Sequence, residues 1–276
     1  MIAFDLVERA EDGEHTFAVY GCRADGDGDL VAELARVIRD LYVDAEHLRD
    51  VLTAAMNDAA TVADGTGIEA AIHRVLTAAI PEPGKNAIPQ LDVARNELAE
   101  ALAYVALAEV HGTVIPAHRI RHKEVPHQPS RGRDLVGLED GPPLVAVIGE
   151  VKASDEAASP PGVVGAGDSS LRGQLEGFLA VRDDALLAEL NWALKHGGPE
   201  HESLIAQAIL AHAAGALALC AAPVLVRPAD VRGADDFGTF RDDPGQFAPA
   251  RVRFSVLVVD RGLNELAQAV YEEARR

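Results

Sequence analysis

The sequence is poor in aromatic residues and cysteine, and each shortage excludes a class of protein. Aromatic side chains make up 4% of the 276 residues although 48% are hydrophobic, so a core must consist mainly of Ala, Val, Leu and Ile. Cys22 and Cys220 lie in apolar surroundings without CxxC spacing, which argues against a disulfide framework or a structural zinc site. The aliphatic composition favours helices packed on a sheet.

The first residues do not have the pattern that we expect of a leader peptide, and no long uninterrupted apolar run is present in the sequence. The chain turns acidic soon after Met1, unlike a secretory signal. The most apolar stretch, Leu204–Val226, contains Gln207 and His212 and is stopped by Pro223, so it is a poor membrane span. We expect a buried helix that runs into a strand, in a cytoplasmic protein with no membrane partner.

Positive charge is scarce as well. Acidic residues outnumber basic ones 44 to 25, giving a formal net charge of -19, which repels phosphate backbones over most of the surface. A nucleic-acid role therefore requires a local basic strip. Such a strip directly precedes Asp134 and contains Arg119, Arg121, Lys123, Arg131 and Arg133. It is a candidate DNA track, and the alternative is a solvated connector whose charges balance the acidic body.

Apolar periodicity and turn residues predict a mixed α/β protein. Expected strands cover about residues 16–22, 134–139, 144–152, 224–227 and 252–259, and expected helices cover about 30–42, 45–79, 92–110, 170–189, 202–219 and from 264 onward. A Pro-rich segment near residue 84 divides an N-terminal strand and helical region, 1–84, from the remainder, 85–276. Asp92 is the expected cap of the third helix.

Two strands near the middle of the chain carry the charged residues of interest. Side chains alternate along a strand, so Glu150 and Lys152 project to the same face. If Asp134 lies opposite Glu150 in a hairpin, Glu139 lies opposite Val145 and residues 140–144 form the loop. Directly opposed residues have Cβ atoms about 5 Å apart. The two carboxylates would then be close together.

Two adjacent carboxylates and a lysine suit phosphodiester hydrolysis. A divalent cation can bridge Asp134 and Glu150, and Mg²⁺ favours a few carboxylates together with water and substrate phosphate. Lys152 would orient the attacking water or offset the growing negative charge. The alternative is that Glu150 and Lys152 form only the solvated end of a strand, because a Glu-x-Lys triplet alone is common. Asp134 at hairpin spacing favours the catalytic interpretation.

Asp134 followed by Glu150-Val151-Lys152 resembles the D…(D/E)xK signature of PD-(D/E)XK nucleases. The resemblance implies a mixed central sheet flanked by helices, with an N-terminal α/β extension, and Mg²⁺ (or Mn²⁺) at the catalytic carboxylates. The superfamily usually adds an acidic residue from the helix before the hairpin. Glu97 is the preferred catalytic and metal-binding candidate, Glu100 is the alternative, and either could be an ordinary solvated carboxylate.

A glutamine downstream also matches the superfamily. Leu171–Leu175 resembles the helix after the ExK strand, which often places a Gln near the site, so Gln174 could bind substrate or a metal-bound water. The alternative is an ordinary polar helix residue. Arg133 stands where a literal PD motif has proline, a position at which the superfamily commonly varies.

The wider arrangement is similar to the nuclease subunit of Hachiman anti-phage defence systems. This resemblance spans most of the chain, although it depends chiefly on Asp134, Glu150 and Lys152. It implies an effector that hydrolyses phosphodiester bonds in DNA and works with a helicase subunit of the same system. Two alternatives remain open: a non-catalytic assembly module with a nuclease fold, and a DNA-repair nuclease.

Overall fold

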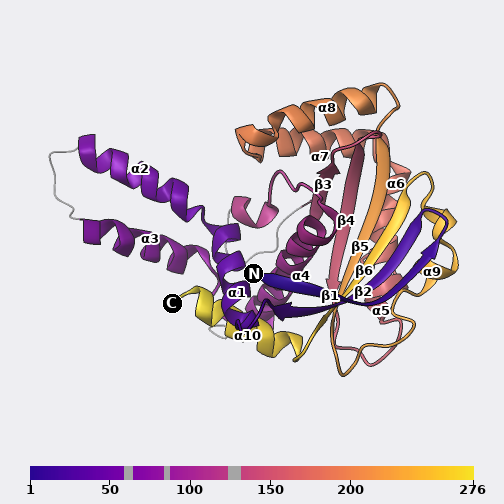
Figure 1. The fold of residues 1–276 in the computed structure, drawn as a ribbon, viewed down its shortest axis with the longest axis horizontal. Coiled ribbons are helices and arrows are strands. Elements are labelled where there is room, and N and C mark those ends of the chain that lie inside the picture. The colour runs from indigo at the N-terminus through magenta and orange to yellow at the C-terminus, as the bar shows by residue number, and fades with distance from the viewer. Residues whose placement is uncertain (59–64, 84–87, 124–131) are drawn as a thin grey trace.

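The chain forms a six-stranded mixed sheet with strand order β1-β2-β6-β5-β4-β3 (Figure 1). The structure is a computed structural model that describes residues 1–58, 65–83, 88–123 and 132–276. The strands are β1 (Ile2–Asp12), β2 (His15–Ala24), β3 (Leu135–Glu139), β4 (Val145–Ala153), β5 (Ala218–Pro228) and β6 (Arg251–Val259). The four inner strands run parallel to one another, and β1 and β3 are antiparallel edges.

Helices connect the strands and pack on the sheet. The main helices are α1 (Leu30–Tyr42), α2 (Ala45–Asp58), α3 (Gly65–Ala79), α4 (Ile88–His111), α6 (Leu171–Ala180), α7 (Arg182–His196), α8 (Glu202–Ala213) and α10 (Leu263–Ala274). Short turns of helix are η1 (Arg119–His122), α5 (Gly162–Gly165), η2 (Pro199–His201), α9 (Thr239–Asp242) and η3 (Pro244–Phe247). Figure 1 shows α2 and α3 projecting away from the sheet.

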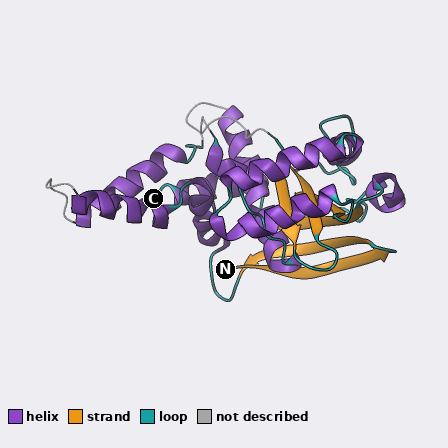
Figure 2. Ribbon diagram, turned by 90° about the horizontal axis from the view of Figure 1, so that it is seen from above, coloured by secondary structure: helices purple, strands orange, loops and turns teal. Residues whose placement is uncertain are grey.

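Both faces of the sheet are covered, as the view from above shows (Figure 2). Helices α1, α4 and α10 contribute to one buried cluster, and α6, α7 and α8 contribute to the other. Strand β4 alternates between the two, with Val147 and Val151 in the first and Ala146 and Ile148 in the second. A parallel sheet buried on both sides explains the apolar strand sequences. The expected mixed sheet flanked by helices is confirmed.

The N-terminal region belongs to this same sheet. The predicted strand at residues 16–22 lies within β2, which pairs in parallel with β6. Strand β1 was not predicted, because it is an edge strand in which Ile2 is the one fully buried residue and charged side chains face solvent. Segments 1–84 and 85–276 therefore share one sheet, and the predicted boundary does not separate two cores.

Several helix boundaries differ from the predictions. Helix α1 has the predicted bounds, and the Asp29 side chain caps it by accepting a hydrogen bond from the Val31 N–H at 3.0 Å. Helix α4 begins at Ile88, so Asp92 lies inside it and is not the cap. The predicted helix at 170–189 is two helices, because Val181 leaves helical geometry and acidic residues begin a new first turn after it.

The apolar stretch 204–226 is a helix that runs into a strand, as predicted, but the helix ends and the strand begins earlier than expected. The helix is also not a buried one, because only Ile205 and Ala208 of α8 are buried. Helix α8 ends at Ala213, Gly215 with φ +67° follows, and β5 already begins at Ala218. Pro223 lies inside β5, opposite Glu150 of β4, instead of preceding a short strand. A short Ala- and Leu-rich run does not distinguish a buried strand from a buried helix, which explains the error.

Two expectations from composition can be compared with the structure. Cys22 and Cys220 are buried and free, and burial raises the pKa of the Cys22 thiol to about 12. Within the described ranges, no helix has both the length and the apolar character needed to cross a membrane.

Candidate active site

The β3–β4 hairpin has the predicted register, with Glu139 opposite Val145. Strand β4 continues past the start of β3, so its carboxyl end pairs only with β5. Directly before β3, the Asp134 carboxylate accepts a hydrogen bond from the Val151 N–H at 2.9 Å. The Tyr104 hydroxyl donates to the Asp134 carbonyl at 2.8 Å. Asp134 is thereby fixed at the open edge of β4.

Glu150 and Lys152 lie together, as strand alternation predicts. The Lys152 ammonium donates to Glu150 Oε1 at 3.0 Å, and an Arg133 guanidinium nitrogen lies 3.5 Å from Oε2. Glu150 is only 2% exposed. Burial and the neighbouring Asp134 carboxylate raise the pKa of Glu150 to about 8, although Lys152 opposes them. Strongly perturbed carboxyl groups of this kind are concentrated at functional sites.

A small cavity opens between α4 and the carboxyl end of β4. Its volume is about 150 Å³, and its lining residues are Val93, Asn96, Glu97, Glu100, Asp134, Val151 and Lys152. The cavity is large enough for several water molecules. Open α/β sheets bind their ligands at the carboxyl ends of parallel strands. The predicted Asp134 and Lys152 therefore face a site where a ligand can enter.

Glu97, the preferred fourth residue, borders this cavity but its carboxylate is already bound. Lys123 and the Tyr42 hydroxyl donate short hydrogen bonds to it, and the Tyr271 hydroxyl donates to Oε2 at 3.3 Å. Burial raises the pKa of Glu97 and Lys123 counteracts the rise. Because the side chain of Lys123 is only 4% exposed, it lies in this network and not on a DNA-facing surface.

Glu100, one turn further along α4, has the opposite character. It is 7% exposed, and its Oε2 has no hydrogen-bond partner among the described residues. Burial, followed by the charges of Asp134, Glu97 and Glu150, raises the pKa of Glu100 well above its ordinary value. Glu100 therefore fits the role of the third acid better than Glu97. Residues three apart share a helix face, so the sequence could not distinguish the two.

The carboxylates form an incomplete set of ligands for a metal ion. Within the described part of the chain, no three His, Cys, Asp or Glu side chains are close enough to share an ion. The predicted three-carboxylate group of Asp134, Glu150 and Glu97 is therefore not assembled. Mg²⁺ commonly uses one or two protein carboxylates and takes its other ligands from water and phosphate. Asp134 and Glu150 fit that pattern, and the unpartnered Glu100 oxygen adds a buried acceptor nearby.

The described members of the predicted DNA track do not form one continuous exposed surface. Its members were Arg119, Arg121, Lys123, Arg131 and Arg133, of which Arg131 lies outside the described residues. Arg119 is ion-paired with Glu189, Lys123 with Glu97, and Arg133 with Glu150. The side chain of Arg121 is 38% exposed, the largest fraction among the four described members.

Gln174 lies on the α6 side of Arg133. Its backbone carbonyl accepts a hydrogen bond from Arg133 at 3.0 Å, and its side-chain Oε1 is buried with no partner in the described ranges. It borders a second cavity of about 350 Å³ between α6 and α7, lined also by Gly132, Arg133, Phe178, Val181, Ala185, Ala188 and Glu189. A buried amide oxygen without a partner is a candidate ligand-binding group.

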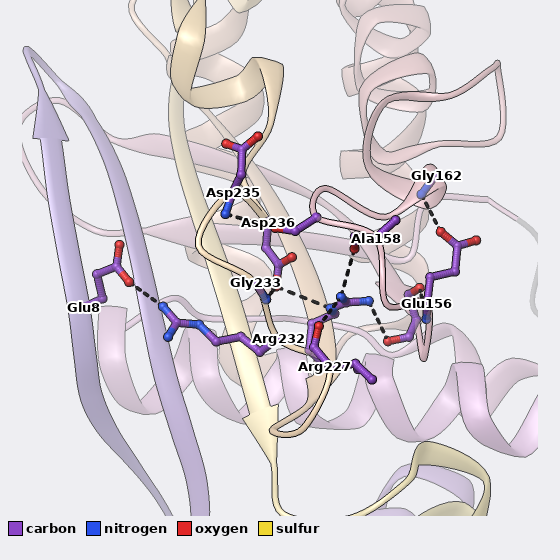
Figure 3. A network of polar contacts seen from close by, with 12 residues as sticks. Glu8, Glu156, Ala158, Gly162, Arg227, Arg232, Gly233, Asp235 and Asp236 are labelled. Atoms are coloured by element: carbon purple, nitrogen blue, oxygen red, sulfur yellow. Dashed lines mark hydrogen bonds and ion pairs between the residues drawn. The ribbon is translucent and has the colours of Figure 1, made fainter.

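A buried ionic network, not predicted from the sequence, holds the loops next to the site (Figure 3). Arg227 at the end of β5 is fully buried and ion-paired with Asp236 at 3.3 Å. Its guanidinium also donates to the backbone carbonyls of Ser154, Ala158 and Val231 at 3.1, 3.1 and 2.7 Å. Strand β4 carries Glu150 and Lys152, and the network connects the loop after β4 to the loop after β5. No local sequence motif predicts this network.

Comparisons with family models, curated proteins and solved structures find no match for this chain.

Proposed function

We propose that the chain is a metal-dependent DNA nuclease of the PD-(D/E)XK type. The observation that carries the proposal is the group at the carboxyl end of β4, where Asp134 lies beside Glu150 and Lys152 is bonded to Glu150. The doubly covered mixed sheet agrees with the nuclease fold that the motif implies. A solvated strand end would not bury Glu150 to 2% exposure beside a second carboxylate.

Each residue has a role that its surroundings support. Asp134 and Glu150 would hold Mg²⁺, or Mn²⁺, directly. Glu100 would act as the third acid through a water molecule on the ion, because no three possible ligands converge among the described residues. When bound, such an ion lowers the pKa of its water and stabilises negative charge at phosphorus. The Lys152 ammonium lies where it can orient the attacking water and offset charge in the transition state. Arg133, beside Glu150, supplies a second positive charge to a scissile phosphate.

The proposal extends to a partner, namely a helicase subunit of an anti-phage defence system. The net charge of -19 and the internal pairing of three basic-strip residues both support delivery of DNA by another protein. The measurement is DNA affinity of the chain alone and with the product of any helicase gene that neighbours its own, at one ionic strength. Tight binding by the chain alone, with no complex formed, would contradict this extension.

A cleavage assay tests the catalytic assignment. Purified protein, alone and with the helicase, is incubated with plasmid and linear DNA in Mg²⁺, in Mn²⁺ and in EDTA. Glu150→Gln and Lys152→Ala should each lose about a hundredfold to a thousandfold in rate, because each removes one preorganised electrostatic contact. Glu272→Gln, at an exposed position on α10, is the matched control. Equal melting temperatures would show that all variants remain folded.

A second function, a non-catalytic assembly module, is favoured by one observation. No three potential metal ligands converge among the described residues. The same assay separates the two functions. Cleavage that survives either substitution at full rate would eliminate the assigned site. A protein that forms a helicase complex but never cleaves DNA in either metal would be the assembly module.

A further inference from the structure

Three aromatic rings form a cluster on the surface beside the candidate active site. His122 belongs to η1, while Trp192 and His196 lie one turn apart on α7. The ring centroids of His122 and His196 are 4.4 Å apart, and those of Trp192 and His196 are 4.8 Å apart with an interplanar angle of 30°. Both histidines are exposed and the tryptophan is half-buried. These three residues are called the ring cluster.

Two arginines lie beside the ring cluster although the protein is strongly acidic, and one of them, Arg119, is also ion-paired with Glu189. The Arg119 guanidinium lies 4.0 Å from the centroid of the Trp192 ring. Burial lowers the pKa of His122, and the nearby charges of His196, Arg121 and Arg119 lower it further. Cationic neighbours of this kind are what a phosphate backbone requires when its bases contact rings.

A short chain of contacts joins the ring cluster to the catalytic residues. Arg119 Nε donates to the Arg133 carbonyl at 3.1 Å, and the Arg133 guanidinium lies 3.5 Å from Glu150. The 350 Å³ cavity between α6 and α7 is lined by Arg133 and by Glu189, the ion-pair partner of Arg119. A polynucleotide bound at Glu150 could therefore extend over this cavity towards the rings.

We propose that the ring cluster is a stacking platform for unpaired nucleotides, which holds single-stranded DNA next to the catalytic residues. Aromatic side chains bind a base through its flat face, and any base offers one when it is not stacked inside a duplex. The platform therefore selects single strands over duplexes. Its link to cleavage rests on the proposed nuclease function, whereas the binding itself does not.

The single tryptophan of the chain makes the proposal directly measurable. Trp192 fluorescence is followed while a thymidine homopolymer is added to the Lys152→Ala protein in EDTA, so that binding is separated from cleavage. Parallel titrations use a duplex and an abasic oligonucleotide of the same length. The abasic strand has the same phosphates but no bases. We expect the homopolymer to quench the fluorescence and to bind on the order of tenfold more tightly than either comparison strand.

Two substitutions test the rings themselves. His196→Ala, at an exposed position, should weaken binding of a fluorescently labelled homopolymer by roughly tenfold, and Trp192→Leu should do so by at least as much. His47→Ala, an exposed histidine on α2, should leave binding unchanged. Equal affinity for abasic and base-containing strands, or a preference for the duplex, would overturn the proposal. If the unsubstituted protein does not cleave DNA but base-containing strands still quench Trp192 fluorescence, only the nuclease assignment is contradicted.

Discussion

Two regions at the carboxyl ends of the parallel strands bury ionisable side chains, and they do so differently. Around Arg227, the carboxylate of Asp236 and three backbone carbonyls surround one guanidinium, and Figure 3 shows two loops joined by it. Around Asp134, the buried acids Glu100 and Glu150 both have raised pKa values, because each is buried and each lies near the Asp134 charge. One Glu100 oxygen has no partner among the described residues.

The difference separates a structural network from a binding site. A buried charge surrounded by partners stabilises the particular loop arrangement that supplies them, whereas a buried acceptor without a partner costs free energy in the empty protein. Acidic groups that oppose one another become favourable when a cation enters. The first region therefore fits a role in holding the end of β4, and the second fits a role in ligand binding.

The largest expected effect comes from opening the Arg227 network. Arg227→Met should lower the free energy of unfolding by about 3–5 kcal/mol, because it leaves Asp236 buried and unpaired. Urea denaturation measures the change. Arg232→Met, which breaks the partly exposed pair with Glu8 in the same view, should cost less than about 1 kcal/mol. Similar losses in the two variants would show that the buried network has no special role.

Separate substitutions of the two acids of α4, Glu97 and Glu100, sharpen the comparison. Glu100→Gln should reduce Mg²⁺-dependent cleavage by about a hundredfold, yet leave the free energy of unfolding unchanged or higher, because it removes like-charge repulsion. Glu97→Gln should destabilise the fold, because Lys123 would lose its buried carboxylate partner. Both variants are assayed for cleavage and by urea denaturation. If Glu97→Gln instead loses activity without loss of stability, Glu97 is the third acid.

The smallest expected effect is a dependence of stability on pH. Burial lowers the pKa values of His111 and His118 to about 4 from an ordinary 6.5, so the unfolded chain binds more protons between these values. The stability that these neutral rings contribute is present above pH 6.5 and is lost as the pH falls towards 4. A fully shielded ring with this shift would lose about 2 kcal/mol between pH 7 and pH 5. Because both rings are partly exposed, solvent screening should reduce the loss for the pair to about 2 kcal/mol.

Paired denaturation curves at these two pH values would measure this loss, and replacing both histidines with Gln should reduce it. The effect bears on the candidate active site because the His118 ring lies 4.7 Å from that of Tyr104, whose hydroxyl donates a hydrogen bond to the Asp134 backbone carbonyl. An unchanged pH dependence in the double variant would assign the loss to other groups.

The hairpin at the site was predictable, whereas the choice of acid was not. Strand alternation and loop length correctly predicted the β3–β4 register. They also predicted that Asp134, Glu150 and Lys152 lie close together, as they do in the structure. The side chains that donate hydrogen bonds to the Glu97 carboxylate are Tyr42 in α1, Lys123 directly after η1, and Tyr271 in α10. They are distant from Glu97 in the sequence, so no local pattern could identify them. The same reason explains why the Arg227 network was missed.

Central strand β6 also determines when the protein can become complete. It lies between β2 and β5 and pairs with both, although it is made after every other strand. During synthesis, the hairpin of β1 and β2 cannot join the sheet until residues 251–259 have left the ribosome, because β2 pairs with the rest of the sheet through β6. Such long-range pairing slows folding and exposes strand edges to aggregation. A chain interrupted before β6 would thus contain Asp134, Glu150 and Lys152 without the completed sheet that supports them.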